Sequence, residues 1–137
     1  MRNLAVAFVL LAAITALFLR ARRFQRWAVS GESMSPTLAP GDWLLVERLR
    51  PGGALPDPGS IVLLTDPRDP RRELVKRLTR LDPDGTAWIE GDNAAQSTDS
   101  RHYGPVPAGS IAGVVRYRYW PLNRAGLIPR RGPRTSV

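Results

Sequence analysis

"ELVKRLTRL", residues 73–81, alternates apolar and polar side chains and therefore predicts a β-strand. In an extended strand Lys76 shares one face with Leu74 and Leu78, and the intervening residues point to the opposite face. Lys76 is the only lysine, since the other nineteen of the twenty basic residues are arginines. If the leucine face is buried, desolvation lowers the pKa of the lysine amine. The alternative is an edge lysine that reaches water, and the alternation alone leaves both open.

Further short strands are predicted on either side of this segment. Loops rich in Pro and Gly separate them, and the chain contains 13 Pro and 12 Gly, which disfavours long helices in the body. A DPDG turn at residues 82–85 connects two of the strands as in a hairpin. We therefore expect a mainly β body of antiparallel strands. The predicted strands lie at about residues 43–48, 60–65, 73–81, 86–90 and 111–120.

Length and composition exclude several classes of site. At 137 residues there is room for one domain. The chain has no Cys and a single histidine, His102, so we expect no disulfide, no metal cluster and no cofactor. The net charge of +8 suits an anionic membrane surface. Nucleic acid is not expected as a partner, because no basic stripe is interleaved with aromatic residues.

The segment LAVAFVLLAAITALFL, residues 4–19, is uncharged and almost wholly apolar. As a helix it would span about 24 Å, and Arg2 and Arg20 could extend their charged groups to the membrane surfaces. A cleaved secretory signal is the alternative, but it requires small residues after the apolar run. The sequence RARRFQR, residues 20–26, follows instead, which favours a retained membrane anchor.

Sequence features predict opposite sides of the membrane for the body. Four arginines follow the apolar run, whereas only Arg2 and the terminal amine precede it, so the positive-inside rule predicts a cytoplasmic body. The four are Arg20, Arg22, Arg23 and Arg26.

A lysine base needs a nucleophile, and SGESMSPTL, residues 30–38, supplies candidate serines. Ser33 lies two residues after Gly31, and a nearby glycine lets backbone N–H groups approach a substrate oxygen, as an oxyanion hole requires. The alternative is that Ser30, Ser33 and Ser35 are ordinary turn serines.

Four segments in this order resemble the signal peptidase I family. SGESMSPTLAPGDWLLV resembles its nucleophile box, GSIVLL an intermediate strand, LVKRL its lysine box, and GDNAAQSTDSRHYGPVP its last box. The resemblance covers most of residues 29–120. It implies a compact, barrel-like antiparallel β catalytic domain behind one N-terminal transmembrane helix. It also implies hydrolysis of a peptide bond by a Ser–Lys dyad.

The resemblance assigns roles residue by residue. Ser33 resembles the nucleophile, Lys76 the general base and Ser97 a second serine that orients the lysine amine. Some members carry a serine where this chain has Gly31, so the oxyanion hole would consist of backbone N–H groups, chiefly that of Ser33. His102 receives no catalytic role. Four further residues resemble those that hold the site by ion pairs and hydrogen bonds: Arg77, Asp92, Asp99 and Arg101.

The implied substrate is the N-terminal signal or leader peptide of a precursor, and the implied surroundings are membrane lipid. EGDNAAQSTDSR, YGPVP and RYRYW also resemble a compact subset, the proteases that mature nickel-type superoxide dismutase by removing its leader. A self-cleaving repressor-type domain lacks support, because no pair of DNA-binding helices precedes the body. A membrane-tethered basic binding module would explain the charge and the anchor, but not the ordered motifs.

We expect three segments: a membrane anchor with its basic flank at 1–26, a catalytic domain at 27–121, and a mobile, basic Pro- and Gly-rich tail at 122–137. The enzyme is expected in the cell membrane with a single pass. General signal peptidases work on the outer face, so the resemblance favours an outer body against the arginine count, and a cytoplasmic body remains the alternative.

Overall fold

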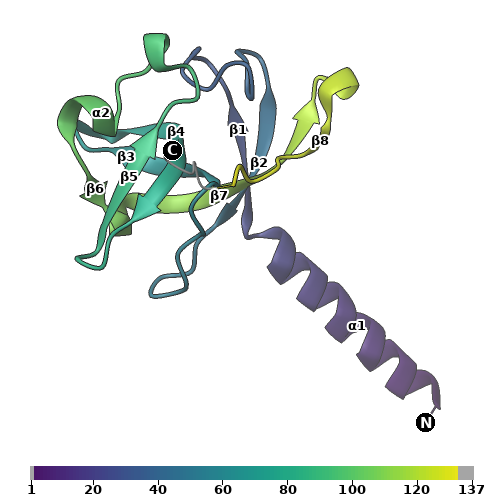
Figure 1. The fold of residues 1–137 in the computed structure, drawn as a ribbon. Helices are drawn as coiled ribbons and strands as arrows, with labels where there is room; N and C mark the ends of the chain where they lie inside the picture. Colours follow the sequence, from purple (N-terminus) through teal and green to yellow (C-terminus); the bar gives the residue numbers. More distant parts are fainter. Residues whose placement is uncertain (1, 133–137) are drawn as a thin grey trace.

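The computed structural model describes residues 2–132 and shows an apolar helix that projects from a β body (Figure 1). Helix α1 spans Arg2–Ala21 and leaves the body at β1. Residues Asn3–Ala21 have a mean hydropathy of 2.4, and none of the most apolar part is buried against the body. Nineteen helical residues span about 28 Å, close to the hydrocarbon thickness of about 30 Å. This helix is therefore long and apolar enough to cross a membrane.

The body consists of β-strands joined by loops and very short helices, as the sequence predicted. Each predicted strand is present. The strand that contains Lys76 begins at Asp69, before the alternating segment, because Asp69 of the predicted charged turn also pairs with β3. The strands are β1 Phe24–Ala28, β2 Trp43–Arg48, β3 Ile61–Asp66, β4 Asp69–Leu81, β5 Thr86–Glu90, β6 Val106–Pro107, β7 Ile111–Trp120 and β8 Gly126–Leu127. The short helices are η1 Ala94–Gln96, α2 Ser100–Tyr103, η2 Ala108–Ser110 and η3 Leu122–Arg124.

All the strands form one antiparallel sheet in the order β1-β2-β7-β3-β4-β5-β6, with β8 added to β7. The long strand β4 pairs with β3 through residues 69–77 and with β5 only from Arg77 onward. Among the described strands, none pairs with the other edge of β4 at residues 69–76. The first half of β4 and the outer side of β1 therefore both present free strand edges.

Two apolar clusters stabilise the sheet, and β3 lies between them. Ile61 and Leu63 belong to one cluster, whereas Val62 and Leu64 belong to the other, so both faces of β3 are buried. This explains why β3 reads as a continuous apolar run rather than as an alternating one. The first cluster also contains Met34 and Leu38 of the loop between β1 and β2, and the second contains Leu78, Ile89 and Val106.

Residues 122–132 pack on the sheet, which corrects the expectation of a mobile tail for this part of the chain. Strand β8 pairs with β7, and the following residue, Ile128, contacts the first apolar cluster. The backbone N–H of Arg131 then donates to the carbonyl of Gly59 at 3.1 Å. Gly59 has φ of +93° and its Cα lies against the backbone of Arg131, so only glycine fits there. Residues 133–137 of the expected tail lie outside the described residues.

Candidate active site

Ser33 lies in the loop that joins β1 to β2, and the core holds this loop in place. Met34 and Leu38 are buried in the first apolar cluster, and the Leu38 N–H donates to the Met34 carbonyl at 2.9 Å. At the base of the loop, the Val29 N–H donates to the carbonyl of Asp42 at 2.9 Å. Ser33 itself is half-buried. A serine fixed beside two buried apolar anchors has the rigid placement that a nucleophile needs.

Asp42, the acid of the GDW sequence, secures the end of the same loop. Its side chain is buried and accepts a hydrogen bond from the Ala39 N–H at 3.0 Å. Arg118 donates to the same carboxylate at 3.0 Å and Arg124 at 3.2 Å. The loop that carries Ser33 is therefore tied to β7 and η3, strands and turns far away in the sequence. The motif contained Asp42, but its role depends on partners that the sequence alone does not bring together.

Lys76 is buried, with an exposed fraction of 4%, which decides between the two alternatives that the alternating pattern left open. Its Nζ donates a hydrogen bond to Ser97 Oγ at 2.9 Å. Burial lowers the pKa of the Lys76 amine, and this effect outweighs the nearby Asp99 carboxylate, which raises the pKa. The amine is thus set to lose its proton more readily than a solvated lysine. An edge lysine that reaches water is excluded by this burial.

The partner of Lys76 is held in turn by a buried carboxylate. Ser97 Oγ donates to Asp99 Oδ2 at 2.5 Å, and the Gly91 N–H donates to the same oxygen at 2.8 Å. Arg101 forms an ion pair with this carboxylate at 2.6 Å. Burial raises the pKa of Asp99, but the hydrogen bonds from Arg101, Gly91 and Ser97 hold it well below the usual range. A charged Asp99 therefore fixes the Ser97 hydroxyl as an acceptor for the Lys76 amine.

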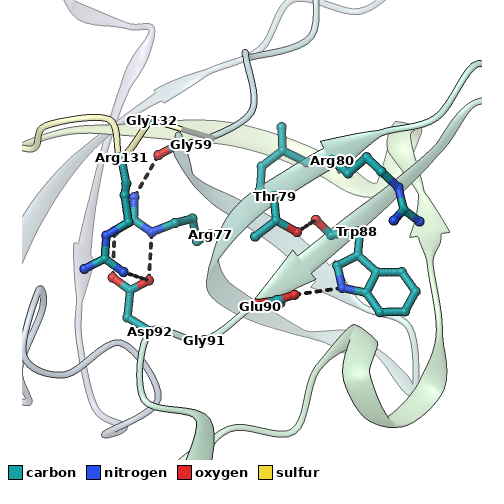
Figure 2. A pocket seen from close by; sticks show the side chains of 11 residues that line it. Gly59, Arg77, Thr79, Arg80, Trp88, Glu90, Gly91, Asp92, Arg131 and Gly132 are labelled. Carbon is teal, nitrogen blue, oxygen red and sulfur yellow. Dashed lines mark hydrogen bonds and ion pairs between the residues drawn. The ribbon is translucent and has the colours of Figure 1, made fainter. Parts of the chain in front are cut away.

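Arg77, which points to the opposite face of β4, forms a second buried ion pair (Figure 2). Its guanidinium donates to Asp92 at 2.6 and 2.7 Å and to the Gly59 carbonyl at 2.7 Å. Asp92 also accepts a hydrogen bond from Thr37 Oγ1 at 2.6 Å, and Thr37 belongs to the loop of Ser33. Burial raises the pKa of Asp92, and Arg77 and Thr37 lower it more strongly. The pair therefore links β4, β5 and the Ser33 loop. Thr37 lies inside the SGESMSPTL segment, but we did not predict a role for it.

Gly91 is the point at which these segments come closest. A methyl group at this position would lie 2.3 Å from Ser97 Oγ and 2.5 Å from the Ser33 carbonyl. Two residues further on, the Asn93 N–H donates to that carbonyl at 2.9 Å. The absence of a side chain at Gly91 therefore lets the Ser33 loop and the Ser97 segment pack together. Gly91 lies inside the motif, but we did not predict this role from the sequence.

Ser33 and Lys76 line the same cavity, which has a volume of about 320 Å³. Trp27, Val29 and Gly31 form one side of it, and residues 72–76 along the free edge of β4 form another. Within the described residues no hydrogen bond joins Ser33 Oγ to Lys76 Nζ, so the two groups face a shared space. A side chain at Gly31 would have no atom within 4 Å, so this glycine leaves open space beside Ser33.

The remaining sequence features lie outside this cavity. His102 accepts a weak hydrogen bond from the Asp99 N–H at 3.4 Å as part of the N-terminal cap of α2, and its side chain is 54% exposed. A second cavity of about 310 Å³ lies on the Arg77 side of β4, between Arg131 and Trp88 (Figure 2). From residue 2 to residue 132, no cluster of acidic or histidine side chains has the arrangement of a metal site.

Comparisons with known proteins identify the family of this chain. The family described as signal peptidase, peptidase S26, matches residues 1–84 and 80–120. The mitochondrial ATP-independent inner membrane protease subunit 1a of Arabidopsis thaliana is 39% identical over 122 residues, which cover 73% of this chain and 73% of that protein. Mitochondrial inner membrane protease subunit 1 of Homo sapiens is 35% identical over 118 residues, which cover 72% of this chain and 71% of that protein. The chain therefore belongs to the signal peptidase family, peptidase S26, and is a membrane peptidase.

Proposed function

We propose that this protein is a membrane-anchored serine endopeptidase that removes N-terminal signal or leader peptides through a Ser33–Lys76 dyad. The observation that carries the proposal is the buried amine of Lys76, held by Ser97 in the cavity that Ser33 also lines. A lysine that only supplied charge for binding would have no reason to be desolvated. Burial that lowers the pKa is the condition under which a lysine can serve as a general base.

The proposed reaction proceeds through an acyl-enzyme. Ser33 Oγ attacks the carbonyl carbon of the scissile bond, and the neutral Lys76 amine takes the hydroxyl proton. The resulting ammonium gives this proton to the leaving amine as the peptide bond breaks. Lys76, neutral again, then takes a proton from water, which attacks the ester, and the ammonium returns this proton to Ser33 Oγ as the ester bond breaks. In this scheme Ser97 and Asp99 are positioning residues, since they contact the amine and its partner rather than the substrate.

Backbone N–H groups are proposed to bind the oxyanion. Because Gly31 has no side chain, the N–H of Ser33 is the chief candidate donor in this chain. The loop around it is held by the contacts of Met34, Leu38 and Asp42 with the sheet, so its N–H groups have a fixed direction. Preorganised donors of this kind contribute a large part of the stabilisation of a tetrahedral intermediate.

The substrate is proposed to bind as an added strand. The cavity lies along the free edge of β4 and is closed on the other side by Trp27 and Val29, at and just beyond the end of edge strand β1. An extended peptide in this gap could form main-chain hydrogen bonds with an unpaired strand edge. Such binding places successive side chains of the peptide alternately on the two faces of the sheet.

The membrane context also supports cleavage of precursors near a bilayer. Helix α1 would anchor the enzyme, and we propose a single pass in the cell membrane with the body on the outer face. The relatives are named as proteases of the mitochondrial inner membrane, which are membrane-associated as well. Maturation of a nickel-type superoxide dismutase stays a prediction from the sequence.

The proposal is tested by cleavage of a leader peptide with small residues before the scissile bond. Ser33→Ala and Lys76→Arg should each abolish cleavage, and the double variant should be no worse, because the two groups act as a unit. Lys76→Arg keeps the positive charge, so a binding module would tolerate it. Ser110→Ala, which removes an exposed hydroxyl elsewhere, is the matched control and should leave cleavage unchanged. Normal cleavage by either single variant would contradict the dyad.

A further inference from the structure

Apart from the buried Lys76, which donates to Ser97, Arg72 and Glu73 are the charged residues of the hairpin formed by β3 and β4 that form no ion pair with another described residue. Four of the five arginines between Asp66 and Leu81 form ion pairs with carboxylates. Two of the three acidic residues in this range, Asp66 and Asp69, belong to those pairs. Within residues 2–132, Arg72 and Glu73 have no ion-pair partner. Their charges are therefore available to an external ligand.

Both residues line the cavity that contains Ser33 and Lys76. They lie in the half of β4 whose edge is not paired with another described strand. Glu73 belongs to the regularly paired part of β4, three residues from Lys76 and on the opposite face, whereas Arg72 lies at the start of the irregular part between Glu73 and Asp69. At about 3.3 Å per residue, the α-carbon of Glu73 lies about 10 Å along the strand from that of Lys76, and Arg72 is the next residue beyond it. The unpaired charges thus mark the far end of the proposed substrate groove.

We infer that Arg72 and Glu73 select substrates by a pair of opposite charges at a fixed distance from the scissile bond. This inference rests on the proposed function, because it takes the peptide to lie along β4 with the residue before the cut beside Lys76. Residues directly opposite one another on neighbouring strands point to the same face. The peptide residue four positions from the one beside Lys76 then meets Arg72 and should be acidic. The residue three positions away meets Glu73 and should be basic.

The order of the two charges, rather than the net charge, carries the specificity. A peptide with the reversed order would place like charges together, which is unfavourable. If the peptide runs parallel to β4, the pair lies in the leader, with the acidic residue fifth and the basic residue fourth before the cut. If it runs antiparallel, the pair lies third and fourth after the cut, with the basic residue first. The position at which the order matters therefore also reports the direction of the bound strand.

The experiment uses the full chain in detergent micelles with the Ser33→Ala substitution, which permits binding without turnover. Fluorescence anisotropy measures the affinity of peptides that carry Glu–Lys, Lys–Glu or two neutral residues at the leader positions, and the equivalent set after the cut. On one side of the cut, the matching order should bind about 2- to 5-fold more tightly than the neutral pair. The difference should shrink at high salt, because partly exposed charges are screened.

The charge-exchanged variant Arg72→Glu/Glu73→Arg keeps the net charge and should invert the preferred order. Arg72→Gln should remove only the gain in affinity from an acidic peptide residue and keep the gain from a basic one. This variant provides a second test if the exchanged variant unfolds. Arg71→Ala is the matched control, because Arg71 is an exposed neighbour that pairs with Asp69 and does not line the cavity. Equal affinity for both orders on both sides, or a preference that both Arg72 variants retain, would overturn the inference.

Cleavage by the unsubstituted enzyme separates this inference from the proposed function. Cleavage of all the peptides with no preference for charge order would leave the peptidase assignment standing and overturn the inference. Binding that depends on the order, without cleavage of any peptide, would support the inference and contradict the proposed function. Comparing peptides on the same enzyme also removes the effect of Arg72 on the pKa of Lys76, because that effect is common to every peptide.

Discussion

In the proposed dyad, Lys76 accepts the proton of Ser33 only in its neutral form, so its pKa should govern the pH dependence of cleavage. Burial lowers this pKa, and the activity should therefore rise with pH along a limb below the ordinary lysine value of about 10.4. Asp99 raises the pKa of Lys76, so Asp99→Asn should shift the limb to lower pH even as it reduces the rate. The kcat/KM profile of both enzymes against pH measures this. A limb at the ordinary lysine value would show that the amine is solvated.

The same shift has a consequence for stability. The folded protein holds the Lys76 proton less tightly than the unfolded chain, so below the folded pKa the fold bears the full cost of a buried charge. This cost disappears as the pH rises from the folded to the unfolded pKa. Lys76→Met should therefore unfold with a weaker dependence on pH over this range while losing activity. Chemical denaturation at several pH values measures the difference, and an unchanged dependence would show that Lys76 does not contribute to it.

Gly91 allows a test of how closely the Ser33 loop must pack against Ser97. Gly91→Ala places a methyl group against Ser97 and the Ser33 backbone, so it should cost about 1–3 kcal/mol of stability and lower kcat/KM. Gly109→Ala is the control, because a methyl group there meets no atom within 4 Å. Melting temperature and cleavage are measured for both variants. Equal behaviour of the two variants would show that the close approach is not required.

At the scale of the residue, the sequence predicted which side chains share a face better than it predicted contacts. The alternation of Leu74, Lys76 and Leu78 placed the amine beside two leucines, because a two-residue period fixes which side chains share a face, but it left open whether that face is buried. The contact of Lys76 with Ser97, 21 residues later, followed only from the family resemblance. Gly91 was missed because its role arises from two segments that meet in space, and no local pattern encodes such a meeting.

At the scale of the element, the sequence predicted strands where apolar residues dominate. It did not predict that the segment after β7 packs on the sheet. Pro, Gly and Arg prevail between Leu122 and Gly132, so the segment lacks the periodicity that reveals a packed element. It is held by β8, by the single apolar anchor Ile128 and by a backbone contact with Gly59. Backbone contacts depend little on side-chain identity, so sequence patterns do not disclose them.

The contact at Gly59 can be tested with a matched pair of glycines. Gly59 and Gly52 both have positive φ, but a methyl group meets the Arg131 backbone only at Gly59. Gly59→Ala should therefore destabilise the protein more than Gly52→Ala, and it should expose the segment after Ile128 to proteolysis. Denaturant unfolding and limited trypsin digestion measure the two effects. An equal loss of stability in both variants would assign the cost to backbone strain alone and leave the docked segment without a role.

At the scale of the whole molecule, the membrane side of the catalytic body is the property on which sequence arguments divide. Helix α1 is of membrane-spanning length, Arg20 lies in its last turn, and Arg22 and Arg23 follow it directly. The positive-inside rule places such a cluster in the cytoplasm. An enzyme that processes exported precursors must instead meet them on the outer face. The proposed function favours the outer face, although the arginines would then lie on the outer side, against the positive-inside rule.

Protease protection of the body in its membrane decides between the two sides. Spheroplasts that express the full chain with an epitope after residue 137 are treated with protease, and the epitope should be lost if the body is outside. Replacing Arg20, Arg22 and Arg23 with Gln should leave an outer body in place, because the change removes positive charge from the outer side. A protected epitope, in cells whose known outer proteins are digested, would place the body inside. The substrates would then be cytoplasmic precursors, as expected for a dedicated maturation protease.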